Sequence, residues 1–122
     1  MILLVDDNKN VLHALRLALE RQGLDVRTAS DGMEAYAAVQ QPDCACMVLD
    51  INMPRFNGVE LLLLMQAEAI SVPTVVMAGF EDFNEPEMKQ FANVVQFLPK
   101  PFDMAAMVQA VRHCTARPVR KQ

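Results

Sequence analysis

One apolar stretch, Cys44–Asp50, restricts the folds open to this chain more than any other feature. Six residues without charge, Cys-Ala-Cys-Met-Val-Leu, end abruptly in the carboxylate of Asp50. A strand this apolar is expected to be covered on both faces, which is typical of a strand inside a parallel sheet. In open α/β sheets, ligands bind at the carboxyl ends of the strands. Asp50 is therefore predicted to lie where chemistry takes place.

Strand and helix patterns alternate along the rest of the chain. The segments that resemble strands are Ile2–Val5, Leu24–Ala29, 44–49, Thr74–Met77 and Val94–Leu98. Helical patterns follow the strands over Val11–Leu19, Met33–Val39, Val59–Met65, Glu87–Ala92 and Met104–His113. Five strand–helix units with short connections predict right-handed crossovers and a parallel sheet with helices on both faces.

Residues at the ends of these segments support the assignment. Side chains that can cap helices precede three of the helical segments: Asn8, Ser30 or Asp31, and Asp103. Gly23 fits the position just past the first helix, where a left-handed residue is common. Asn93 ends the fourth helix and is expected to be left-handed, a conformation that Asn tolerates better than most residues. The segment Pro99–Pro101 is predicted to break the fifth strand.

Length and charge exclude several classes of protein. A chain of 122 residues fits one domain with a sizeable core. A net charge of −4 and a pI near 5.0 argue against direct binding to nucleic acid. The sequence has no apolar run of about 18 residues that could span a membrane. The short segment Met1–Val5 runs directly into two aspartates, which argues against a signal peptide and for a cytoplasmic location.

The sulfur-containing residues are predicted to be structural. Cys44, Cys46 and Cys114 form no metal-binding pattern. Cys44 and Cys46, two apart on a strand, are expected to share one face, where they cannot easily pair with each other. The simplest interpretation is small buried side chains in a reducing compartment. Four methionines are likewise expected to fill the core: Met33, Met65, Met77 and Met104.

Four charged residues follow three of the predicted strands. Asp6 and Asp7 follow the first strand, Asp50 ends the third, and Lys100 follows the fifth. Taken alone, each aspartate could be a cap or a turn residue. In a parallel sheet all four residues would lie at one edge, where the carboxylates would raise each other's pKa unless a cation joined them. A divalent ion such as Mg²⁺ together with a lysine suits a phosphoryl group, with a carboxylate as nucleophile.

Together and in this order, the motifs of the chain resemble the receiver domain of bacterial two-component response regulators. The motifs are Asp6-Asp7, Asp50 followed by Asn-Met-Pro, Asn57-Gly58, and Lys100-Pro101-Phe102 after Phe97-Leu98. The resemblance covers residues 2 to about 114. It implies a flavodoxin-like, doubly wound, five-stranded parallel sheet of order 2-1-3-4-5 with five helices. Residues 1–114 would form the receiver domain. Residues 115–122 would be a C-terminal tail or the start of a linker to an effector domain.

The resemblance also implies roles for individual residues. Asp50 would accept a phosphoryl group from a histidine kinase or a phosphotransfer protein. Lys100 would contact that group, and Phe97 would be the aromatic residue that moves inward on activation. The bond between Lys100 and Pro101 would be cis. The ligands of Mg²⁺ would be Asp6, Asp7, Asp50 and the backbone carbonyl of Asn52.

By the same resemblance, the domain would signal rather than act as an enzyme, beyond self-catalysed phosphoryl transfer and autodephosphorylation. The face built from the fourth helix, the fifth strand and the fifth helix would contact an effector domain, a partner protein or a second copy of the chain.

The chain departs from the family pattern at two positions. The family places Thr or Ser at the end of the fourth strand, where spacing from Lys100 assigns Ala78. Ala78 has no hydroxyl to bond a phosphoryl oxygen, so phosphorylation is expected to reach Phe97 weakly. Asn93 replaces a glycine, which is a smaller change.

Three other functions are alternatives to a phosphorylated receiver domain. An aspartyl-phosphate hydrolase would need a second carboxylate where Asn52 stands, and its nucleophile would follow the first strand. A flavodoxin would need a phosphate-binding loop after the first strand, where Asp6 and Asp7 would repel phosphate. A pseudo-receiver, which binds partners without phosphorylation, is favoured by Ala78, whereas the intact acidic residues and the lysine argue against it. Phe97 could also be an ordinary half-buried aromatic residue.

Overall fold

The computed structural model describes residues 1–53, 57–79 and 90–116. Its five strands are β1 (Ile2–Val5), β2 (Val26–Ala29), β3 (Cys46–Asp50), β4 (Thr74–Gly79) and β5 (Val94–Lys100). They form one sheet in the order β2-β1-β3-β4-β5, and every neighbouring pair is parallel. The predicted topology is therefore confirmed.

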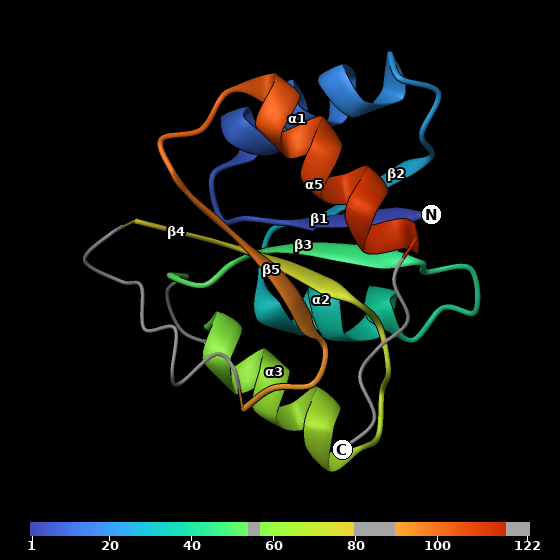
Figure 1. Cartoon of the computed structure of the whole chain (residues 1–122). Coiled ribbons are helices and arrows are strands. Elements are labelled where there is room, and N and C mark those ends of the chain that lie inside the picture. Colours follow the sequence, from blue (N-terminus) through green and yellow to red (C-terminus); the bar gives the residue numbers. More distant parts are fainter. Residues whose placement is uncertain (54–56, 80–89, 117–122) are drawn as a thin grey trace.

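Helices cover both faces of the sheet (Figure 1). Helices α1 (Lys9–Glu20) and α5 (Met104–Ala116) lie on one face, and α2 (Gly32–Val39) and α3 (Gly58–Ala67) lie on the other. The described part of the chain thus contains four helices rather than the five expected. Of the helix expected over Glu87–Ala92, residues 87–89 lie outside the described residues, and residues 90–92 are not helical.

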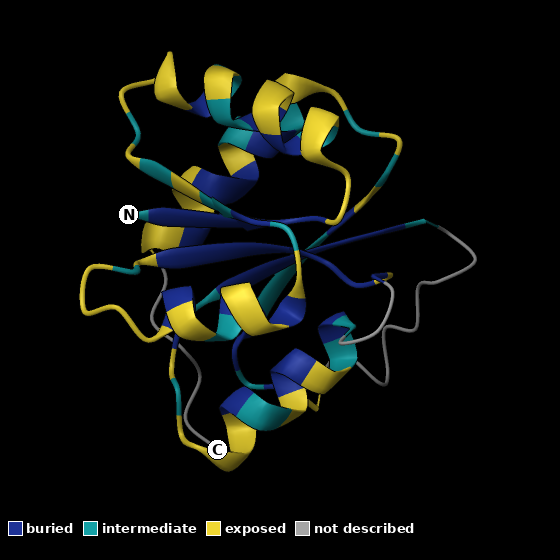
Figure 2. Cartoon of the chain, turned by 180° about the vertical axis from the view of Figure 1, so that it is seen from behind, coloured by how far each residue is buried: buried dark blue, intermediate teal, exposed yellow. Residues whose placement is uncertain are grey.

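The core consists of two layers, one on each side of the sheet (Figure 2). Alternate residues of β1 and β3 point to opposite layers, as the period of two along a strand requires. Residues of these strands in the layer under α2 and α3 are Leu3, Val5, Met47 and Leu49. Those in the layer under α1 and α5 are Ile2, Leu4, Cys46 and Val48. Strand β3 is buried along its whole length, as its composition predicts.

Strand β5 extends further than the sequence predicts. It includes Pro99 and runs to Lys100, so the expectation that Pro99–Pro101 breaks the strand was wrong at its start. The physical reason is that β5 is an edge strand, where a residue without an N–H group can face the unpaired side. The extension carries Lys100 into the sheet at the level of Gly79 on β4.

The helix ends follow the predicted caps with one exception. The side chains of Asn8, Asp31 and Asp103 accept backbone N–H bonds at the starts of their helices. Gly23 is left-handed, with φ of +82°. Asn93 is not left-handed; its amide Nδ2 donates to the carbonyl of Ile70 at 2.7 Å instead. This hydrogen bond joins the segment before β5 to the segment before β4, which explains a polar side chain there.

Two expectations about sulfur-containing residues were wrong. Met65 and Met77 are buried, but Met33 and Met104 are 63 % and 38 % exposed, because they lie on the outer faces of their helices. Cys44 does not share a face with Cys46. It precedes the first residue of β3, and it packs against the layer under α2 and α3, whereas Cys46 belongs to the opposite layer.

Gly58 allows α3 to begin directly against the end of β3. A Cβ atom at this position would lie 2.7 Å from Cα of Ile51 and 3.1 Å from the carbonyl oxygen of Asp50. The amide of Gly58 also donates to the carbonyl of Ile51 at 3.2 Å. Because backbone atoms cannot move aside as a flexible side chain can, only glycine fits here. The contact fixes the residue that follows Asp50.

We predict that Gly58→Ala lowers the free energy of unfolding by about 1–3 kcal/mol, because the added methyl group overlaps backbone atoms. Chemical denaturation measures this change. The matched control is Gly23→Asn, since nothing lies within 4 Å of a Cβ at Gly23 and Asn tolerates its left-handed backbone. Equal losses of stability in the two variants would contradict the steric explanation.

Candidate functional site

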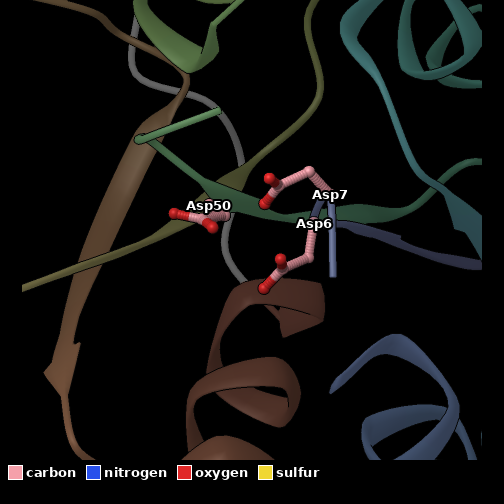
Figure 3. A group of neighbouring side chains, drawn as sticks. All are labelled: Asp6, Asp7 and Asp50. Carbon is pink, nitrogen blue, oxygen red and sulfur yellow. The ribbon is translucent and has the colours of Figure 1, made fainter. Parts of the chain in front are cut away.

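Three carboxylates converge at the carboxyl ends of β1 and β3 (Figure 3). Val5 and Leu49 are partners in the parallel register of these neighbouring strands, so the residues that follow them, Asp6 and Asp50, lie side by side. Asp7 joins them, and one ligand oxygen from each of the three carboxylates lies within 4.8 Å of the others. The structure therefore brings together the acidic residues that the sequence placed at strand ends.

Backbone amides orient two of these carboxylates. The amide of Asn8 donates to Oδ1 of Asp6 at 2.9 Å, and the amide of Asn52 donates to Oδ1 of Asp50 at 3.1 Å. In both cases the donor lies two residues further along the chain, which is the geometry of an Asx turn. Asn8 thus has two functions, because its side chain also caps α1. The sequence predicts the cap but not the hydrogen bond from the Asn8 amide, which the two-residue spacing from Asp6 could have indicated.

Two of the three acidic residues are buried. Asp6 and Asp50 are 2 % and 4 % exposed, whereas Asp7 is exposed. Burial raises the pKa of Asp6 from its ordinary value of 3.8 to about 6. The hydrogen bond from Asn8 and the charge of Lys100 oppose this increase, and the charges of Asp50 and Asp7 add to it. Without a cation, Asp6 therefore holds its proton to a higher pH than an ordinary aspartate does.

Lys100 supplies the positive charge of the site. Its Nζ lies 3.3 Å from Oδ2 of Asp50, although its side chain is 38 % exposed. The peptide bond to Pro101 is cis, as predicted. The sequence placed Lys100 at the correct edge of the sheet but did not predict a direct ion pair with Asp50. That pair depends on β5 continuing through Pro99.

The two residues proposed to transmit a signal lie on β4 and β5. Ala78 is buried and follows Met77, the partner of Asp50 in the register of β3 and β4. Phe97 is half-buried on β5 and packs against the layer under α2 and α3. Their positions agree with the roles that the resemblance implies, and the roles themselves stay predictions. So does ligation of a metal by the carbonyl of Asn52.

The donor set of the site fits a hard divalent cation. All three converging groups are carboxylates, and Mg²⁺ prefers oxygen ligands, using a few carboxylates and completing its shell with water. A cation would also relieve the repulsion that contributes to the raised pKa of Asp6. Lys100 comes from β5, whereas Asp6 and Asp7 follow β1 on the opposite side of β3. Its ammonium group could balance the charge of a ligand bound to the carboxylate of Asp50.

This arrangement defines a class of protein: an open, doubly wound α/β domain with a cluster of carboxylates and a lysine at the carboxyl ends of its strands. A family model described as the response regulator receiver domain matches residues 2–112. The chain belongs to this family of signalling domains.

Known proteins agree with this assignment. The chain is 32 % identical over 111 residues to the response regulator MprA of Mycobacterium leprae, covering 91 % of this chain and 49 % of that protein. It is 33 % identical over 111 residues to the transcriptional regulatory protein PrrA of Mycobacterium tuberculosis, covering 91 % and 48 %. The receiver domain of the Francisella response regulator 1452 superimposes with a TM-score of 0.83 at 25 % identity, covering 95 % and 96 %.

The chain spans about half the length of the curated relatives that it matches. Within residues 1–53, 57–79 and 90–116, no helix has the length and apolar character needed to cross a membrane.

We predict that Asp6→Asn stabilises the metal-free domain at about pH 7 by about 1–3 kcal/mol. The folded state holds the Asp6 proton more tightly than the unfolded state does, since the pKa rises from 3.8 to about 6. The stability that this group contributes is therefore complete below about pH 4 and is lost as the pH rises through about 6. The amide of Asn avoids that loss. Thermal unfolding of both chains in the presence of a metal chelator, at several pH values across this range, measures the difference in stability.

The matched control for this prediction is Asp25→Asn, which removes an exposed carboxylate outside the site. It should leave the pH dependence of stability unchanged. A pH dependence between about pH 4 and 6 that persists in Asp6→Asn would contradict the assignment of the titration to Asp6.

Proposed function

We propose that this domain accepts a phosphoryl group on Asp50 from a histidine kinase or a phosphotransfer protein, in the presence of Mg²⁺. One observation carries the proposal: the buried carboxylate of Asp50 lies between Asp6 and Asp7 on one side and Lys100 Nζ, at 3.3 Å, on the other. The neighbouring carboxylates could bind a divalent cation, and the ammonium group of Lys100 could pair with the oxygens of a phosphoryl group on Asp50.

The proposed reaction is a nucleophilic displacement at phosphorus. An oxygen of Asp50 forms a bond to the phosphorus atom while the bond from phosphorus to the donor's nitrogen breaks. Bound Mg²⁺ would neutralise charge on the transferring oxygens, with Asp6, Asp7, Asp50 and the carbonyl of Asn52 as its protein-side ligands. The amide of Asn52 holds Oδ1 of Asp50 in place through its hydrogen bond.

Lys100 would keep an anionic partner throughout this reaction. Before transfer its ammonium group pairs with Oδ2 of Asp50. After transfer, Asp50 is an acyl phosphate, which is a mixed anhydride, and the phosphoryl oxygens carry the negative charge. A short movement of Lys100 would exchange the carboxylate for a phosphoryl oxygen without leaving the ammonium unpaired.

A small phosphodonor tests this proposal directly. We expect Mg²⁺-dependent addition of one phosphoryl group that hydroxylamine removes, with the label on the peptide containing Asp50. Intact-mass and peptide mass spectrometry detect both results. Asp50→Asn should abolish labelling, while Asp43→Asn, a change to an exposed aspartate shortly before β3, should not. A folded wild-type chain that stays unlabelled would favour the pseudo-receiver, the alternative that Ala78 supports.

We further propose that Ala78 weakens the coupling between phosphorylation and Phe97. Ala78 lies beside the partner of Asp50 at the end of β4, where a hydroxyl could bond a phosphoryl oxygen and draw β4 toward the site. That charge-assisted hydrogen bond would contribute about 1.5–3 kcal/mol, and its absence leaves the inactive and active conformations nearly unbiased by phosphorylation.

We predict that Ala78→Thr strengthens the effect of a phosphoryl analogue on Phe97. The equilibrium constant between the outward and inward positions of Phe97, with the analogue bound, should increase by roughly 10- to 150-fold over the wild-type chain, which is the equivalent of that hydrogen bond. NMR of the labelled Phe97 ring, with and without beryllofluoride and Mg²⁺, measures the two populations. Ala78→Val is the control, because valine has the shape of threonine without the hydroxyl. Equal responses of the Thr and Val variants would show that volume, and not the hydrogen bond, changes Phe97.

The output is proposed to be control of a separate effector. MprA and PrrA carry the names of a response regulator and a transcriptional regulatory protein, and each is about twice as long as this chain. We propose that residues 1–114 are the receiver part of such a cytoplasmic pathway and that 115–122 lead towards an effector. The face that the resemblance implies, built from the expected fourth helix, β5 and α5, would bind that effector or a second copy. The acidic domain itself would not contact nucleic acid.

A further inference from the structure

Two of the three cysteine thiols meet in the core, far from the acidic site. Sγ of Cys46 lies 2.8 Å from Sγ of Cys114, although the two residues are 68 positions apart in the sequence. Both side chains are completely buried. Cys46 is the first residue of β3, and Cys114 lies in the last turn of α5, which ends at Ala116. Neither residue takes part in the proposed phosphoryl transfer.

We propose that Cys46 and Cys114 are the site of a reversible intramolecular disulfide, which ties the end of α5 to the central strand β3. The sulfur–sulfur bond of a disulfide is about 2.0 Å long, so a change of roughly 0.8 Å in the separation of these atoms would form it. Hydrogen bonding already directs the thiol of Cys46 at the sulfur of Cys114. The fold thus holds two thiols in contact across two different elements.

Cys44 is excluded from this pair by its position. It precedes β3 and packs against the layer under α2 and α3, on the opposite side of the sheet from Cys46. Its thiol is directed at the carbonyl of Cys46, at 3.9 Å, rather than at a sulfur. Cys44 is also partly exposed, which makes it an internal reference for the reaction of an unpaired thiol in the same chain.

The surroundings of the pair protect it while α5 is docked. The thiol of Cys114 donates to the carbonyl of Pro73 at 3.2 Å. The hydrogen bond to Cys114 and burial together raise the pKa of the Cys46 thiol well above its ordinary range. Since the thiolate is the reactive form, oxidation in the closed state is slow. Helix ends open more readily than sheet interiors, so the last turn of α5 gives the route by which a small oxidant reaches Cys114.

With a peroxide as the oxidant, the reaction has two balanced steps. The sulfur of Cys114 attacks a peroxide oxygen of hydrogen peroxide, the O–O bond breaks, and the products are a sulfenic acid and water. The sulfur of Cys46 then attacks the sulfur of Cys114, the S–O bond breaks, and the leaving hydroxyl takes the Cys46 proton as a second water. The two thiols lose two electrons, which reduce the peroxide. A small dithiol reverses the step by thiol–disulfide exchange.

The experiment treats the full 122-residue chain with hydrogen peroxide, blocks remaining thiols with an alkylating agent and maps the peptides by mass spectrometry without reduction. We expect a cross-linked peptide pair that contains Cys46 and Cys114 and disappears on treatment with dithiothreitol. Cys44→Ser should give the same cross-link, whereas Cys46→Ala and Cys114→Ala should give none. Thermal unfolding of the reduced forms checks that each variant is folded.

A second measurement needs no variant. The oxidised wild-type chain should unfold at a temperature higher by at least about 5 °C than the reduced chain, because the disulfide closes a long loop in the unfolded state. Dithiothreitol should cancel the increase. Cross-links that join Cys44 or two copies of the chain, or a Cys46–Cys114 pair that stays reduced while Cys44 is consumed, would overturn the proposal and leave the pair as a buried structural contact.

Discussion

The mutual repulsion of three carboxylates, balanced by one lysine, is the constraint on which the rest of this structure depends. Asp6 and Asp50 are forced together because β1 and β3 are parallel neighbours in register, and Asp7 follows immediately. Lys100 offsets part of that charge from the far side, at 3.3 Å from Asp50. Burial is the main cause of the raised pKa of Asp6, and the negative charges of Asp50 and Asp7 add to it. The excess negative charge at this edge of the sheet is what a cation would bind.

The surrounding structure holds these charges in place by backbone contacts. Amides two residues beyond Asp6 and Asp50 fix one oxygen of each carboxylate. The absence of a side chain at Gly58 lets α3 begin against Ile51, directly after Asp50. The path of β5 through Pro99 delivers Lys100. Each contact depends on a short-range sequence feature, and each acts at the carboxyl end of a strand. The more exposed groups of the site are Asp7 and Lys100.

Much of the fold could be predicted because its signals are local. The apolar stretch before Asp50, the helical periods and the caps at Asn8 and Asp103 depend on neighbouring residues only, and the strand–helix alternation leaves few topologies. Errors arose where tertiary context changed a local rule. Pro99 is tolerated because β5 is at an edge, and Asn93 keeps an ordinary backbone because its side chain bonds Ile70. Met33 and Met104 are exposed because they lie on the outer faces of their helices. Their apolar character alone does not say which face of a helix they occupy.

By itself, the sequence determined the class of the fold, the edge of the sheet where chemistry is expected and the identity of the charged residues there. It could do so because strand ends and their charges are properties of neighbouring residues. Only the tertiary structure decided the ion pair between Lys100 and Asp50, the raised pKa of Asp6 and the meeting of Cys46 with Cys114. These three features depend on distances and burial between residues that are far apart in the chain, and such quantities exist only once the sheet and its helices have packed.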